Sequence, residues 1–111
     1  MKQGRVYFSD IPCGTITEDA TGFSFVYDTE YLASGNAQPV SLTLPLQEEP
    51  YKNSVLFSFF DGLIPEGWML NIAERNWKIS RYDRMALLLS CCRDCIGNVR
   101  VEPIYQEEER R

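Results

Sequence analysis

The chain has 111 residues, of which 44% are hydrophobic, and its 16 acidic and 11 basic residues give a formal net charge of −5. This length predicts one domain, which we place at 1–105, followed by a charged tail at 106–111. The acidic surplus argues against direct binding to a nucleic-acid backbone, which needs a dense positive surface. The first residues alternate in polarity, so we expect no signal peptide or membrane helix, and a cytoplasmic location.

The first quarter of the sequence alternates apolar and polar residues, a pattern typical of short strands. We expect strands at 6–8, 15–17 and 23–27, with turns at 11–14 and 21–22 between them. In the third strand the aromatic residues fall at every second position and therefore share one face of a sheet. These strands predict an antiparallel meander.

The middle of the chain continues this pattern after a short helical turn predicted at 28–33 and closed by Gly35. Val40, Leu42 and Leu44 alternate with polar neighbours, which predicts a fourth strand. A polar segment with a proline, 47–53, is predicted to be a surface loop. The apolar run that follows it, 55–60, is compatible with either a strand or a helix.

Two consecutive helices are predicted in the second half. Pro65 suits the first position of a helix that reaches about Trp77, and Ser80 with Asp83 can form a capping box for a second helix ending near Cys91. A last strand is expected at 98–102. The sequence therefore predicts an α+β fold: a mostly antiparallel sheet with two consecutive helices packed on it.

Catalytic chemistry finds little support in the sequence. The chain has no histidine, the residue most often used for proton transfer near neutral pH. Arg93-Asp94-Cys95 and Phe60-Asp61-Gly62 resemble fragments of kinase motifs, but the phosphate-covering glycine loop and its lysine are missing and the order is wrong. We expect a protein that is not an enzyme and that needs no cofactor.

The cysteines offer one metal hypothesis. Cys91, Cys92 and Cys95, with Cys13 elsewhere in the chain, could supply thiolates to zinc. A zinc ribbon usually has two separated Cys-x-x-Cys pairs, and Cys92 falls on the apolar stripe of the second helix. The alternative, which we favour, is that these cysteines are reduced and serve as small hydrophobic residues.

The first predicted helix carries an unusually wide apolar arc, with Trp68 at its edge. One core cannot easily cover the whole arc. Trp68 could pack on the sheet, as tryptophans in small domains usually do, or project from the surface as an anchor for a partner. Composition alone leaves the choice open.

Two motifs carry a resemblance to a known family. Residues 59–68, Phe-Phe-Asp-Gly-Leu-Ile-Pro-Glu-Gly-Trp, resemble the Phe-Phe-x-x-Leu-Leu-Pro-Glu-Gly segment of the amino-terminal subdomain of HipA-type toxin kinases. Leu87-Leu88 followed by Arg-Asp-Cys-Ile-Gly-Asn-Val at 93–99 is similar to that family's second motif. The strands near the start and the segment at 41–46 are similar as well, so the resemblance covers nearly the whole chain.

The resemblance implies a relation to HipS, the stand-alone equivalent of this subdomain in three-gene HipBST systems. It implies binding to a HipT-like serine/threonine kinase, with a HipB-like DNA-binding protein completing the complex. The expected kinase contacts are Trp68, with Glu66, Gly67 and Met69 beside it, and Asp61. Three functions stay open: inhibition of the kinase, assembly of the complex without inhibition, and zinc binding by a small metal protein.

Overall fold

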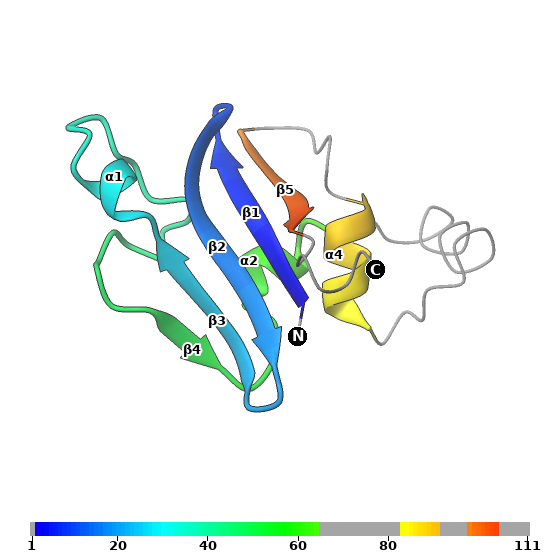
Figure 1. Ribbon diagram of the computed structural model, residues 1–111. Coiled ribbons are helices and arrows are strands. Elements are labelled where there is room, and N and C mark those ends of the chain that lie inside the picture. The colour runs from blue at the N-terminus through cyan, green and yellow to red at the C-terminus, as the bar shows by residue number, and fades with distance from the viewer. Residues whose placement is uncertain (1, 65–82, 92–97, 105–111) are drawn as a thin grey trace, which may run out of the picture.

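The computed structural model describes residues 2–64, 83–91 and 98–104. Five strands form one sheet in the order β4-β3-β2-β1-β5, and every neighbouring pair is antiparallel (Figure 1). The elements in chain order are β1 (Lys2–Phe8), β2 (Ile11–Asp19), β3 (Gly22–Tyr27), α1 (Thr29–Leu32), β4 (Tyr51–Asn53), α2 (Ser58–Asp61), α4 (Arg84–Cys91) and β5 (Val99–Ile104). The predicted antiparallel sheet is confirmed.

One face of the sheet forms the core. The strand pairing places Val6 opposite Val101 and Ile16 opposite Phe25. All four side chains lie on this face and are fully buried. Figure 1 shows α2 behind the sheet and α4 beside β5. These helices add buried residues to the same cluster: Phe60, Met85, Leu87 and Leu88.

Close packing of α4 on β1 depends on a glycine. A Cβ atom placed on Gly4 would lie 2.6 Å from Cδ2 of Leu89 and 2.8 Å from a methyl group of Val101. A larger residue would have to displace these two side chains, so glycine allows the closest packing of the helix on the strand.

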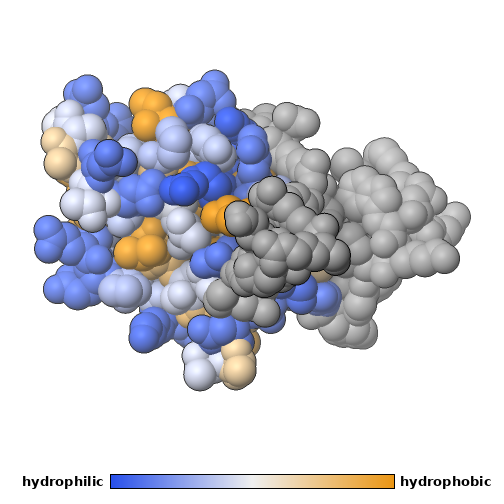
Figure 2. All heavy atoms as spheres, viewed as in Figure 1, coloured by the Kyte–Doolittle hydropathy of each residue, from blue (hydrophilic) through white to orange (hydrophobic). Residues whose placement is uncertain are grey.

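The opposite face of the sheet is covered by no element among the described residues, and it is mainly hydrophilic (Figure 2). Arg100 lies 4.0 Å above the centre of the Tyr7 ring and forms an ion pair with Glu102 on the same strand. Arg5 pairs with Asp28 at 3.0 Å. These contacts explain how charged residues of the strands are accommodated.

The predicted turn at 11–14 is wrong, because the strands reverse two residues earlier. Ser9 and Asp10 form a two-residue loop with φ of 50° and 67°, and Phe8 pairs with Ile11 across it. Such a loop matches the twist of a hairpin, and aspartate tolerates this left-handed conformation better than most residues. Pro12 is therefore accommodated within β2, next to an irregularity in the ladder.

The predicted strand at 40–44 is also wrong. Val40 and Leu44 are buried, but the chain folds back between them, with one isolated bridge from Ser41 to Leu44 and with Leu42 97% exposed. Tyr27 supplies the reason, since its hydroxyl bonds to the backbone of both Val40 and Leu44 and so occupies groups that a strand ladder would use.

Strand β4 falls inside the segment predicted to be a loop, because Tyr51–Asn53 pairs with Phe23–Phe25 on β3. The apolar run after it becomes the single-turn helix α2. The predicted short helix after β3 is confirmed as α1. None of the helices among the described residues is long and apolar enough to cross a membrane.

Of the two consecutive helices predicted, α4 is present and ends at Cys91, as expected. The predicted start is wrong: α4 begins at Arg84, and Asp83 caps it by accepting from the amide of Ala86, whereas Ser80, the predicted cap, lies outside the described residues. The predicted helix from Pro65 to Trp77 and the tail at 106–111 also lie outside them.

Candidate partner-binding site

Helix α2 and the turn after it contain the first residues of the motif at 59–68, which ends at Trp68. Phe60 and Ile64 are buried at the two ends of this turn, and the amides of Leu63 and Ile64 donate to the carbonyl oxygens of Phe60 and Asp61 at 3.0 and 3.2 Å. The turn is thus anchored by apolar side chains and by its own backbone. This fixes the position from which the chain continues at Pro65.

Asp61 lies on the outer side of this turn. Its Oδ1 accepts a hydrogen bond from Nε of Arg84 at 2.7 Å, and the two side chains are 44% and 33% exposed. The pair joins α2 to the first residue of α4 across 23 positions in the sequence. A hydrogen bond between two charged groups is stronger than one between neutral groups. Solvent weakens this one, because both side chains are partly exposed.

Among the five predicted kinase contacts, the structure describes Asp61 and places it in this ion pair. Glu66, Gly67, Trp68 and Met69 lie outside the described residues. Their role stays a prediction.

Sequence reasoning missed Arg84 as part of this site. A cation in the first turn of a helix is unfavourable, because the helix dipole is positive there. An arginine at that position therefore indicates a nearby acidic partner, and this signal could have pointed to Asp61. The sequence could not choose among the other acidic residues.

The metal hypothesis rests mainly on cysteines that the structure does not describe. Cys91 ends α4, its side chain lies outside the described part, and so do Cys92 and Cys95. Cys13 is fully buried, and this burial, aided by the charge of Asp28, raises the pKa of its thiol to about 12. No group of three potential metal ligands occurs among the side chains that the structure describes.

The architecture defines a small α+β domain in which helices cover one face of a five-stranded antiparallel sheet. Residues 4–102 match the family model of the HipA N-terminal domain. A solved structure described as the N-terminal domain of HipA toxin superposes with a TM-score of 0.75 and 26% identity, covering 96% of both chains. The chain therefore belongs to the HipA N-terminal domain family, and the resemblance found in the sequence is confirmed. In HipA this domain is a non-catalytic subdomain.

In one relative the matching sequence makes up nearly the whole protein, and in another it is a small part of a longer protein. An uncharacterized protein of Haemophilus influenzae is 28% identical over 102 residues, which make up 92% of each chain. A putative kinase of Sinorhizobium fredii, Y4mE, is 30% identical over 95 residues, which cover 85% of this chain but 23% of that protein. Family membership relates the chain to HipA-type toxin–antitoxin components.

Proposed function

We propose that this protein is a HipS-like antitoxin subunit that binds and inhibits a HipT-like serine/threonine kinase toxin. The family match over residues 4–102 carries the proposal. The Sinorhizobium relative supports a kinase as partner, because the matching region there is a small part of a longer putative kinase. The Haemophilus relative supports action as a separate chain, because the match spans nearly all of that protein.

Trp68 is the proposed anchor in the kinase, assisted by Glu66, Gly67 and Met69. A large aromatic side chain that enters a desolvated pocket contributes more to binding than most interface residues do. The Asp61–Arg84 pair supports this assignment, since it joins described residues that lie shortly before and shortly after the segment 65–82. When the residues that flank a segment are held together, binding through that segment loses less conformational entropy.

A HipB-like DNA-binding protein is the proposed third member of the complex. With a net charge of −5, the chain is suited to reach nucleic acid through a partner rather than by itself. We propose a cytoplasmic location for this complex. If the DNA-binding subunit alone neutralises the kinase, the present chain has an assembly or modulating role instead.

The decisive experiment is a titration of HipT-like kinase activity and of complex formation with the wild-type chain and with Trp68→Ala. Wild type should inhibit in a dose-dependent way, and Trp68→Ala should weaken both binding and inhibition by about tenfold or more. Val55→Ala is the matched control, because Val55 is also a large apolar residue and is 63% exposed. Its titration should follow that of wild type.

Each outcome separates the alternatives. Binding without inhibition would favour the assembly role, and absence of binding by a folded wild-type chain would refute the proposal. Full inhibition by a folded Trp68→Ala variant would refute the anchor while leaving the inhibitor role in place. Circular dichroism of each variant establishes that it is folded.

A further inference from the structure

The connection between α1 and β4 exposes an apolar side chain that the domain itself does not use. Leu42 is 97% exposed, whereas Val40 and Leu44 on either side are 7% and 3% exposed. We call residues 40–44 the Leu42 turn. An isolated exposed leucine is common on protein surfaces, so its significance depends on how firmly its backbone is held.

Hydroxyl groups of two buried tyrosines fix the backbone around the Leu42 turn. The Tyr27 hydroxyl donates to the carbonyl of Leu44 and accepts from the amide of Val40 at 3.0 Å. The Tyr31 hydroxyl donates to the carbonyl of Gln38 at 2.7 Å and accepts from the amide of the same residue at 2.9 Å. The chain is thereby bonded to α1 before Leu42 and to β3 both before and after it.

The turn is also closed internally. The amide of Leu44 donates to the carbonyl of Ser41 at 3.1 Å, and the amide of Thr43 donates to the Ser41 hydroxyl at 3.2 Å. Leu42 therefore stands at the tip of a turn that is held by several backbone hydrogen bonds on either side of it. Binding through such a residue loses little conformational entropy, since the turn is ordered beforehand.

Two acidic residues occur a few positions after the turn. Glu48 and Glu49 are exposed, and Leu46, shortly before them, is 37% exposed. In this short stretch of the chain, two exposed leucines, Leu42 and Leu46, precede two exposed glutamates. The complementary surface is an apolar pocket with lysine or arginine side chains at its rim.

We propose that the Leu42 turn is a second docking point, received by an apolar pocket with a basic rim on the kinase. This inference rests on the proposed function for the identity of the partner. The turn lies on the β3–β4 side of the sheet, away from α4 (Figure 1). The turn contacts the kinase at a different place from the region around the Asp61–Arg84 ion pair. Two separate contacts on one domain fix the orientation of that domain on the kinase.

The test compares kinase binding by the full-length wild type, Leu42→Ser and Val55→Ser, using biolayer interferometry. Leu42→Ser should weaken binding by about tenfold or more, because it removes a side chain that fills a pocket. Val55→Ser, the control at another exposed aliphatic residue, should stay within about twofold of wild type. Both variants should melt at the wild-type temperature, since neither side chain contributes to the core.

Charge reversal supplies an independent measurement. Glu48→Lys combined with Glu49→Lys should slow association with the kinase at low salt, and the difference from wild type should shrink as salt rises. An unchanged association rate would refute the basic rim.

The outcomes distinguish this inference from the proposed function. Wild-type affinity in Leu42→Ser, or an equal loss in both serine variants, would overturn the docking role of the turn while leaving the kinase-binding proposal standing. A lower melting temperature of Leu42→Ser would also overturn it, because the exposure of Leu42 would then be contradicted. Failure of wild type to bind the kinase would overturn both proposals.

Discussion

Cys13 and Tyr27 are buried groups whose protonation matters to the fold. Cys13 lies at the irregularity where Val6 pairs with Gly14 but Tyr7 pairs with Pro12, so it is the extra residue of a bulge in β2. Burial raises the pKa of its thiol from 9.0 to about 12, with a further contribution from Asp28 and an opposing one from Arg5. Burial likewise raises the pKa of Tyr27 from 10.0 to about 12, and the bond from the Val40 amide opposes it.

These two shifts predict a loss of stability in alkali. Both groups bind their protons more tightly when folded, so their contribution is complete below pH 9.0 and decreases as pH rises toward about 12. Urea unfolding between pH 7 and pH 11 should show a decreasing free energy of unfolding above about pH 9. Cys13→Ala should be less stable at neutral pH but should lose less of its stability as pH rises. An identical pH slope in this variant would contradict the role of the thiol.

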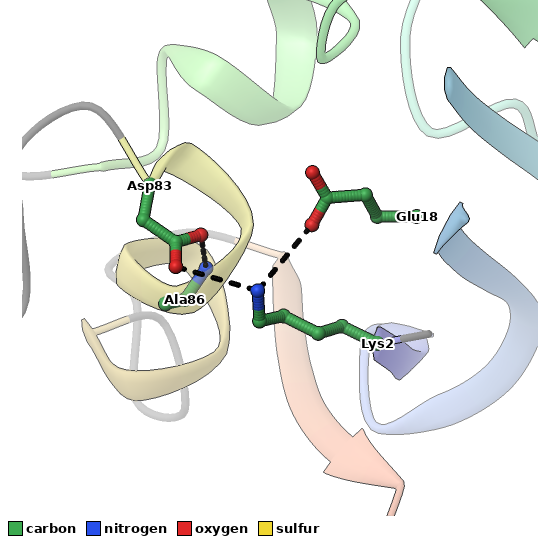
Figure 3. Close-up of polar contacts among 4 residues, drawn as sticks. All are labelled: Lys2, Glu18, Asp83 and Ala86. Carbon is green, nitrogen blue, oxygen red and sulfur yellow. Dashed lines mark hydrogen bonds and ion pairs between the residues drawn. The ribbon is translucent and has the colours of Figure 1, made fainter. Parts of the chain in front are cut away.

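Helix α4 is tied to the sheet at its first turn. Asp83 Oδ1 accepts from the amide of Ala86 at 3.1 Å, which caps the helix, while Oδ2 lies 3.3 Å from Nζ of Lys2 (Figure 3). Lys2 also lies 3.7 Å from the carboxylate of Glu18 on β2. One aspartate thus serves both the start of the helix and the first residue of β1.

The cap and the ion pair should contribute unequally. Asp83→Ala should lower the free energy of unfolding by about 1 kcal/mol, because an amide of the first turn loses its acceptor. Lys2→Met should lower it by less, since the lysine and aspartate side chains are 45% and 38% exposed and exposed pairs are worth little. Urea denaturation of both variants at neutral pH measures the difference. A larger loss in Lys2→Met would show that the ion pair, and not the cap, holds α4.

Considered as a whole molecule, the domain is built around a continuous apolar cluster that joins the sheet, α2 and α4 and that includes Cys13. A cysteine in such a place packs as a small hydrophobic residue, because its thiolate is strongly disfavoured there. We therefore expect burial of apolar side chains, and not a bound ion, to stabilise the domain.

Chelation tests this view of the whole molecule. We expect EDTA or a zinc-specific chelator to leave the melting temperature unchanged, and elemental analysis of the purified protein to find no stoichiometric zinc. In a zinc-dependent fold, metal binding is part of the folding free energy, so chelation would unfold the protein. Stoichiometric zinc together with chelator-induced unfolding would support the alternative function and would point to Cys91, Cys92 and Cys95.

The sequence by itself determined the features that depend on local periodicity. Alternation at 23–27 predicted that the aromatic residues of β3 share one face, the helical pattern predicted α4, and the motifs at 59–68 and 93–99 indicated the family. Residues close in the chain carry this information, because strand and helix repeats place neighbouring side chains on defined faces.

Only the tertiary structure decided the features that depend on distant partners. Leu42 continues the alternation of Val40 and Leu44, yet it is exposed because the Tyr27 hydroxyl takes the backbone bonds that a strand would have used. Several residues could pair with Asp61. Arg84 does so because α2 and α4 pack on the same face of the sheet. In both cases the local sequence is compatible with more than one arrangement. The packing of distant elements decides which arrangement forms.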